Sequence, residues 1–322
     1  MACESNAPRN PSTISDRAAN PKSDSSAAWV ASPIDATSVD GSWFIADAEQ
    51  DAVIVIGANG MLRHRFGRRG SGPGELKTPT AVGVKGDSIF VADIGNRRLT
   101  TFTRDGAFVS SRVAPTDCSN SSAAGIRAAT EAVFVLYKCR LSISEVELRV
   151  VEFRDGNFVR STLADTVRAR EPNVSPVAFP LFDVSGDILV LGNGHGPCLK
   201  LLRLDSMRSA SPFCLEQVGQ VRASTEALSR LRSRTRGALD VPDFLPRALA
   251  VALDGDNLFV LHPVDDDRTE WLVLNVSRPN ESPTVVAGPL TSRSFFDGRD
   301  LLSFSGESGG YVPEIAPMRT AR

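Results

Sequence analysis

The chain has 322 residues, of which 42% are hydrophobic and 23% charged, which is enough apolar material for a large core. Its 36 Lys and Arg residues against 38 Asp and Glu give a net charge of −2, a balance that argues against a protein whose main task is to grip nucleic-acid phosphates. No run approaches the roughly 18 consecutive apolar residues of a membrane-spanning helix, and only 3 His residues supply imidazole.

The N-terminal 28 residues differ in composition from the rest of the chain. They are rich in Ala, Ser, Asn and Pro, and their only large apolar side chains are Met1 and Ile14. Such a segment cannot bury enough surface to offset the entropy lost when it becomes ordered. The sequence therefore predicts a disordered tether at 1–28 and a folded domain at 29–322.

A cysteine, Cys3, stands near the start of this tether, directly after the small residue Ala2. A small residue before a cysteine, followed by a polar linker, resembles the mature N-terminus of a bacterial lipoprotein. The resemblance implies that Cys3 is lipidated and that the domain meets the membrane only through this anchor. The alternative is an incidental cysteine in a disordered tail.

From residue 29 onward, short apolar strands alternate with tight turns. The Gly-Asp turn at 86–87 precedes the apolar run 89–91, and the Asp-Gly turn at 254–255 precedes 258–260. A second turn follows in most units, so each unit holds three to four antiparallel strands. The units recur at about the spacing of propeller blades, near 45 residues. The sequence predicts an all-β, six-bladed β-propeller of four-stranded antiparallel blades, in which residues 29–31 and the C-terminal strands share the closing blade.

One unit, at 67–109, carries a family resemblance. It contains the Gly-rich stretch 70–74, a proline at 79, and the sequence Ala92-Asp93-Ile94-Gly95-Asn96. This pattern resembles an NHL repeat, in which the Gly-rich loop enters the blade and the Ala-Asp-x-Gly-Asn turn joins its second and third strands. The other units are degenerate. The resemblance implies an NHL-like propeller, a fold that hosts lyases, lactonases and pure binding modules.

A short helical insertion is expected near 222–239. Ala227, Leu228 and Leu231 fall on one face of this helix, and arginines surround them. It follows an outer strand, which places it on the face where second-to-third strand loops and outer-to-inner connections gather. We call this face the loop-rich face.

Four of the five cysteines can pair locally. Cys198 and Cys214 lie equally far from residue 206 in the turn at 205–206, so a hairpin centred there places them opposite each other. Cys118 precedes an inner strand and Cys139 follows the next strand, which puts both on the same face of a propeller. These pairings favour an oxidising compartment and leave Cys3 as the one cysteine without a partner. The alternative is four buried thiols in a cytosolic protein.

Candidate site residues lie where second strands end. Asp47, Asp93, Tyr137 and His262 share one aligned position in their blades, and His195 comes three places beyond it in the fourth. We expect these five side chains to form the rim of a ligand-binding funnel on the loop-rich face. The alternative is a central Zn²⁺ or Ca²⁺ held by His195, His262, Asp47 and Asp93, although Asp93 also has a structural explanation as the turn residue that bonds backbone amides.

The leading hypothesis is a non-enzymatic, monomeric binding module that recognises a protein, peptide or glycan without a cofactor. Its expected location is the bacterial cell envelope or periplasm, lipid-anchored or otherwise secreted. The rival is a metal-dependent hydrolase or lyase of the lactonase or amidating-lyase type, with Tyr137 or Asp93 as acid–base partner. Nucleic acid is not an expected ligand, because the arginine clusters have acids nearby and lack interleaved aromatic residues.

Overall fold

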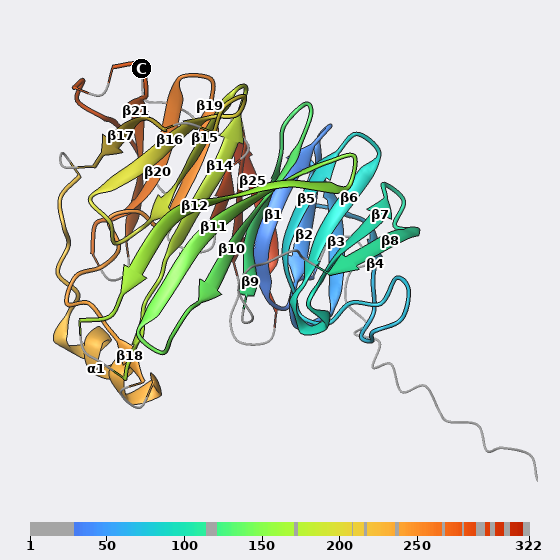
Figure 1. Cartoon of the computed structure of the whole chain (residues 1–322), viewed down its shortest axis with the longest axis horizontal. Coiled ribbons are helices and arrows are strands. Elements are labelled where there is room, and N and C mark those ends of the chain that lie inside the picture. Colours follow the sequence, from blue (N-terminus) through green and yellow to red (C-terminus); the bar gives the residue numbers. More distant parts are fainter. Residues whose placement is uncertain are drawn as a thin grey trace, which may run out of the picture.

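The computed structural model describes residues 29–113, 121–170, 173–207, 209–215, 218–235, 238–265, 268–278, 280–287, 294–296, 300–305 and 310–317. The tether predicted at 1–28, with Cys3, lies outside these ranges, as does Cys118. Within them the chain is almost entirely β-structure, arranged as a six-bladed β-propeller (Figure 1). This confirms the fold class expected from the sequence.

In the described parts of the chain, five blades are four-stranded antiparallel sheets whose strands follow in chain order. The first two blades are β1 (Pro33–Val39), β2 (Ser42–Asp47), β3 (Ala52–Gly57) and β4 (Leu62–Phe66), then β5 (Pro79–Lys85), β6 (Ser88–Asp93), β7 (Arg98–Thr103) and β8 (Phe108–Val113), with a 3₁₀ turn, η1 (Ile94–Asn96), between β6 and β7. The third and fourth are β9 (Ser121–Ala128), β10 (Val133–Arg140), β11 (Glu145–Arg154) and β12 (Asn157–Arg168), then β14 (Pro180–Ser185), β15 (Ile188–Asn193), β16 (Cys198–Arg203) and β17 (Ser209–Cys214). The fifth is β19 (Ala250–Asp254), β20 (Asn257–Pro263), β21 (Thr269–Asn275) and β22 (Thr284–Ala287).

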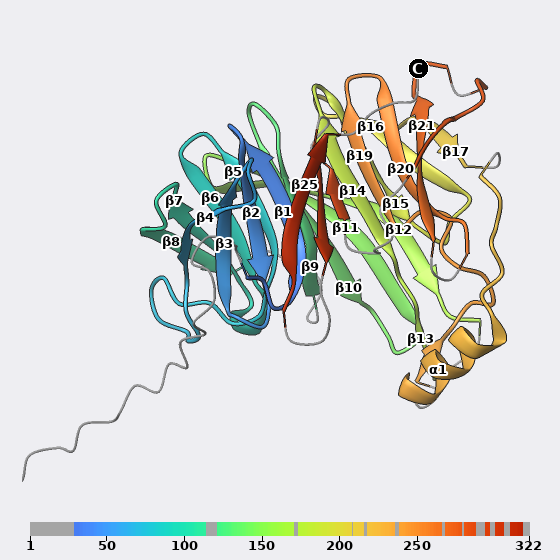
Figure 2. The same ribbon diagram turned by 180° about the vertical axis from the view of Figure 1, so that it is seen from behind.

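The sixth blade is completed by the N-terminal segment. Its strands are β23 (Ser294–Phe296), β24 (Asp300–Ser305) and β25 (Val312–Pro317), and Val30 forms an antiparallel bridge with Tyr311 beside β25. The two residues exchange both backbone hydrogen bonds, at 3.0 and 2.6 Å. Figure 2 shows β25, in red, next to β1, in blue. The shared closing blade predicted from residues 29–31 is therefore present, and it joins the two ends of the ring.

The inner strands close a ring around the axis. β1, β5, β9, β14, β19 and β23 contact one another in chain order, and β23 also contacts β1. Turns between first and second strands use residues that tolerate positive φ; Gly86, for example, adopts φ +55°, a conformation that glycine reaches at no steric cost.

Period-two alternation in the strands fills the interfaces between blades. Trp43 and Ile45 of β2 pack toward Leu302 of the sixth blade, whereas Phe44 and Ala46 pack toward the second. Six apolar clusters formed by the described residues fall in the six interfaces between neighbouring blades. Each buried aliphatic or aromatic side chain contributes about 1.5–3 kcal/mol, so the contacts between blades, more than any single sheet, hold the ring together.

Two insertions meet on the loop-rich face. The helix α1 (Thr225–Thr235) lies between β17 and β19, within the predicted range 222–239, and Figure 1 shows it at the lower left, beyond the strand ends. Strand β13 (Ser175–Pro176) pairs in parallel with β18 (Leu239–Asp240), which joins the insertion before β14 to the one before β19. Among the described residues, no helix is long and apolar enough to cross a membrane.

Candidate functional site

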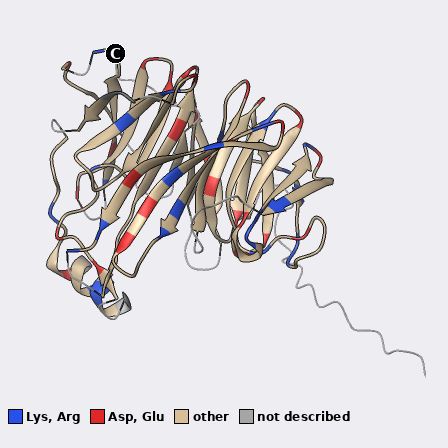
Figure 3. Ribbon diagram, viewed as in Figure 1, with Lys and Arg blue, Asp and Glu red and all other residues tan. Residues whose placement is uncertain are grey.

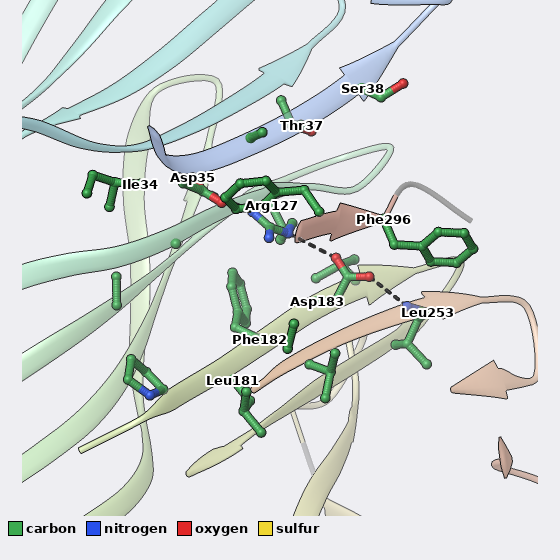
Figure 4. A pocket seen from close by; sticks show the side chains of 18 of the residues that line it. Ile34, Asp35, Thr37, Ser38, Arg127, Leu181, Phe182, Asp183, Leu253 and Phe296 are labelled. Atoms are coloured by element: carbon green, nitrogen blue, oxygen red, sulfur yellow. Dashed lines mark hydrogen bonds and ion pairs between the residues drawn. The ribbon is translucent and has the colours of Figure 1, made fainter. Parts of the chain in front are cut away.

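An ion cluster lies on the axis of the ring. Arg127 of β9 stands between Asp35 of β1 and Asp183 of β14 (Figure 4). Its Nη1 is 3.2 Å from Asp35 Oδ1, and its Nε is 3.0 Å from Asp183 Oδ1. The side chains of Asp35, Asp183 and Arg127 are only 6%, 14% and 20% exposed. One guanidinium from the third blade therefore bridges carboxylates from the first and the fourth.

Each carboxylate also reaches the next blade. Val82 N of β5 donates to Asp35 Oδ2 at 3.1 Å, and Leu253 N of β19 donates to Asp183 Oδ2 at 2.7 Å. The cluster consequently links the inner strands of the first five blades. Because every bond crosses a boundary between blades, it stabilises the arrangement of the blades relative to one another rather than any one sheet.

Burial dominates the electrostatics of the two acids. Removal from water raises the pKa of Asp35, and the positive charge of Arg127 and the hydrogen bond from Val82 only partly oppose this. The same balance raises the pKa of Asp183, where Arg127 and the backbone N–H of Leu253 oppose burial.

A cavity of about 480 Å³ surrounds this cluster. Its lining includes every residue of β1 from Pro33 to Val39, so it follows the axis along the whole of that strand. The hydroxyl-bearing residues Thr37 and Ser38 contribute polar lining, and Figure 4 shows them on β1 beyond Asp35. Phe179, Phe295 and Phe296 contribute aromatic lining. A cavity of this size with a few convergent polar groups fits a small ligand.

Asp47, predicted at the funnel rim, is fully buried. Its Oδ1 accepts hydrogen bonds from the backbone of Ser32, Glu49 and Gln50 at 3.0–3.1 Å, and its Oδ2 accepts from Ala31 N at 2.6 Å. Gln50 Nε2 is a further donor to Oδ2, at 2.9 Å. The carboxylate thus fastens the N-terminal segment to the end of β2 and presents no surface to a ligand.

Asp93 has the corresponding function in the second blade. Its carboxylate is fully buried and accepts from Lys77 N at 2.7 Å, Asn96 Nδ2 at 2.7 Å and Arg98 Nε at 2.8 Å. Arg98 in turn donates to three carbonyl oxygens of the Gly-rich loop, those of residues 71, 72 and 75. A Cβ at Gly95 would lie 2.6 Å from Lys77 O, which explains the glycine in this turn. These contacts support the structural explanation for Asp93, that of a turn residue.

The remaining predicted rim residues are also largely buried. Tyr137 is 4% exposed, and burial raises its pKa. His262 is 7% exposed, with Nδ1 2.9 Å from Arg247 O. His195 is half-buried, burial lowers its pKa, and its ring meets the edge of the Phe179 ring at 6.4 Å between centroids.

The two histidines do share a neighbour. Arg247 N donates to Gly194 O at 2.7 Å, so the Arg247 backbone touches both His262 and the residue before His195. Within the described ranges, however, no group of three or more His, Cys, Asp or Glu side chains is placed to hold a metal ion. The structure therefore does not gather His195, His262, Asp47 and Asp93 into one centre.

The Cys198–Cys214 disulfide is present and confirms the predicted pairing. The two residues face each other across β16 and β17, with their Cα atoms 3.9 Å apart. Cys139 is also disulfide-bonded. Its predicted partner, Cys118, lies outside the described residues, so that pairing stays a prediction.

The axial residues Asp35, Arg127 and Asp183 were not predicted as site residues. Each is the single charged residue of its first strand, as in Pro180-Leu181-Phe182-Asp183-Val184-Ser185. A charge inside the innermost strand of a blade has little access to bulk solvent, and three such strands occur in this chain. That pattern is the signal from which the cluster could have been found.

Neither a protein-family model nor a curated protein matches the chain. Among solved structures, a luciferin-regenerating enzyme is similar with a TM-score of 0.53 and 9% identity, over 89% of this chain and 92% of the other. A chain of a nidogen–laminin complex has a TM-score of 0.48 and 14% identity (77% and 78% covered), and an exported protein of Bacteroides fragilis has 0.48 and 12% (80% and 72% covered). The first likeness supports the fold alone. The chain is a six-bladed β-propeller, and its membership of the NHL family is not confirmed.

Proposed function

We propose that the chain is a binding module that acts outside the cytoplasm and recognises a protein or peptide on its loop-rich face, as a monomer and without catalysis. The observation that carries this proposal is a platform built on that face from the β10–β11 loop (141–144) and the described residues of the insertions at 169–178 and 218–249. We call it the insertion platform.

Hydrogen bonds join the parts of the insertion platform. Ala169 N donates to Ser144 O at 2.9 Å, and Arg170 bonds Asp240 through its backbone N at 2.6 Å, its Nε at 3.0 Å and its Nη2 at 2.7 Å. Arg232 of α1 forms an ion pair with Asp243 at 2.9 Å. These contacts lie beyond the strands that close the ring, so closure does not account for them.

The insertion platform displays large apolar side chains to solvent. Leu141, Ile143 and Phe244 are 49%, 53% and 42% exposed. Single exposed apolar residues are ordinary, but several in loops of one face are typical of surfaces that bind another protein. The charges around them are mixed: Figure 3 shows basic and acidic residues interspersed around α1 and along β9–β12, which favours an apolar contact with a polar rim over an electrostatic one.

The Cys198–Cys214 disulfide is consistent with an extracytoplasmic location, because such bonds form and persist in oxidising compartments. We propose the cell envelope or periplasm as that location, with Cys3 as the site of a lipid anchor.

The test is selection of a displayed peptide library against the immobilised full chain, followed by affinity measurement. Ile143→Asp and Phe244→Asp should each weaken the selected peptides at least about tenfold, because a charge in the centre of an apolar interface is left unpaired. Val285→Asp is the matched control, because Val285 is 51% exposed on β22, the outer strand of the fifth blade, and is not part of the insertion platform. It should change affinity less than about twofold. Failure to enrich any peptide, or binding that both platform variants leave intact, would refute the proposal.

A further inference from the structure

We infer that the cavity on the axis is a second binding site, which takes an uncharged, polyhydroxylated ligand: a monosaccharide, or the terminal residue of a glycan. This inference does not depend on the proposed function, since none of the platform residues tested above lines the cavity.

The charges in the cavity select an uncharged ligand. Two carboxylates, those of Asp35 and Asp183, face the space, so an anionic ligand would be repelled. A cationic ligand would seek the position between the carboxylates, which the guanidinium of Arg127 already occupies at 3.2 and 3.0 Å. A cationic ligand would therefore have to displace the guanidinium from a buried ion pair, which costs several kcal/mol. A neutral ligand needs no such change.

The hydrogen-bonding groups in the cavity match hydroxyls. Arg127 donates from Nε and Nη1 to its partners, whereas Nη2 meets no acceptor among the described residues. The hydroxyls of Thr37 and Ser38 likewise have no partner in that part of the chain. A sugar hydroxyl both donates and accepts, so it can bond a guanidinium N–H, a side-chain hydroxyl and an unused carboxylate lone pair in one place.

Aromatic side chains give a second and independent indication. Phe179, Phe295 and Phe296 line the cavity, and the ring of Phe296 lies 5.8 Å from the ring of the fully buried Trp271. Aromatic faces with a few polar groups suit the C–H face of a sugar ring.

The experiment is titration of the full chain with matched sugars, followed by saturation-transfer NMR and calorimetry. Glucose, galactose, mannose and N-acetylglucosamine are the uncharged probes, and glucuronic acid and glucosamine are the charged ones. At least one uncharged sugar should bind, and the charged analogues should bind at least about tenfold more weakly. Absence of binding by all four uncharged sugars, or preference for a charged analogue, would overturn the inference.

Variants locate the site. Thr37→Val should weaken the bound sugar about fivefold with little effect on folding, because it removes one hydroxyl and keeps the shape of the side chain. Ser38→Ala should weaken it similarly, by removing the second hydroxyl. Thr101→Val is the matched control, since Thr101 lines a different groove, between the second and third blades, and together with Ile143→Asp it should leave sugar binding unchanged. Binding that survives both Thr37→Val and Ser38→Ala would overturn the inference.

The source of the sugar can be read from the same assay. A trisaccharide of the preferred sugar that binds at least as tightly as the monosaccharide would support the shared chemistry and assign a glycan end. A trisaccharide that does not bind, while the monosaccharide does, would support the same chemistry and identify a free sugar as the ligand.

Discussion

Replacing Arg127 with methionine should be among the most damaging single changes in the ring. The substitution keeps a long side chain between Asp35 and Asp183 but removes the positive charge that both carboxylates face at 3.0–3.2 Å. Their bonds to Val82 N and Leu253 N would remain, so the loss falls on the bridge between the first, third and fourth blades.

The expected loss of unfolding free energy at pH 7 is about 3–5 kcal/mol, the usual cost of leaving a buried charge without its partner. Protonation sets a ceiling on the cost for each of the two acids. Neutralising one aspartate at pH 7 costs about 4 kcal/mol, since its reference pKa of about 3.9 lies some three units lower and each unit is worth about 1.4 kcal/mol. The side chains of Asp35 and Asp183 are only 6% and 14% exposed, so water screens little of the effect.

Urea unfolding followed by tryptophan fluorescence measures this loss, because Trp43 and Trp271 are buried in different blades. The control is Arg203→Met, which breaks an ion pair with Asp187 whose side chains are 59% and 65% exposed. Such exposed pairs contribute about 0–1 kcal/mol, and the control should fall in that range.

Two further results follow from the same reasoning. Adding Asp35→Asn and Asp183→Asn to Arg127→Met should recover at least half of the loss, because the amide oxygens still accept from the backbone and no charge is buried. The penalty of Arg127→Met should also shrink as the pH falls through the raised pKa values of the two acids, since the protonated forms need no cation. A penalty below about 1 kcal/mol at pH 7, or one that grows with acidification, would refute the account of the cluster.

Three other changes test separate parts of the structure. Cys198→Ala with Cys214→Ala opens a loop with a sequence separation of 16 and should cost about 3 kcal/mol by the chain-entropy estimate; an unchanged urea midpoint would contradict this. Asp93→Asn should lower the unfolding free energy by about 2–4 kcal/mol, because it removes the charge that faces Arg98 at 2.8 Å. Backbone hydrogen exchange should become faster in residues 70–77; exchange as slow as in the wild type would contradict this role of Asp93. His195→Asn should flatten the dependence of unfolding free energy on pH between about 5 and 7, because burial lowers the pKa of His195. The contribution of His195 to stability is present above its unfolded pKa of about 6.5 and is lost as the pH falls through the lowered value. Parallel pH profiles for the variant and the wild type would contradict this.

The ring itself follows from local features of the sequence. Period-two runs such as 43–46 place alternate side chains on the two faces of a strand, and turn residues such as Gly86 fix where each strand ends. The Cys198–Cys214 pair and the helix at 225–235 were predictable for the same reason. Each depends on residues near in sequence, for which spacing alone determines what is opposite or adjacent.

The candidate site depends on contacts between residues far apart in the sequence, and fewer of these contacts could be predicted. It placed Asp47 and Asp93 at the ends of their second strands, but it could not show that Ala31 and Lys77 would donate backbone N–H groups to them. The axial cluster was harder still. Residues 35, 127 and 183 become neighbours only when three different inner strands converge on one axis, in a register that no single repeat reveals.

Only part of the insertion platform could be predicted from the sequence. The arginine-rich helix was expected, but its connection to the other insertion runs through β13 and β18, which are two residues each. A parallel pairing of two such short segments leaves no periodic pattern in the sequence, because two residues span a single strand period and less than one helical turn, so nothing repeats. Burial and the Arg170–Asp240 contacts hold it in place.

Everything proposed for the axis requires that the first and last blades meet, and hydrogen exchange at two amides measures this most directly. Val30 N and Tyr311 N bond each other's carbonyl oxygens, although they are nearly the full domain apart in sequence. If the ring is closed, both amides should exchange only through large-scale opening, with protection close to that of the core strand β2. Exchange at both positions as fast as in the exposed turn at 86–87 would show that the ends are not joined, and the shared axis of Asp35, Arg127 and Asp183 would be contradicted.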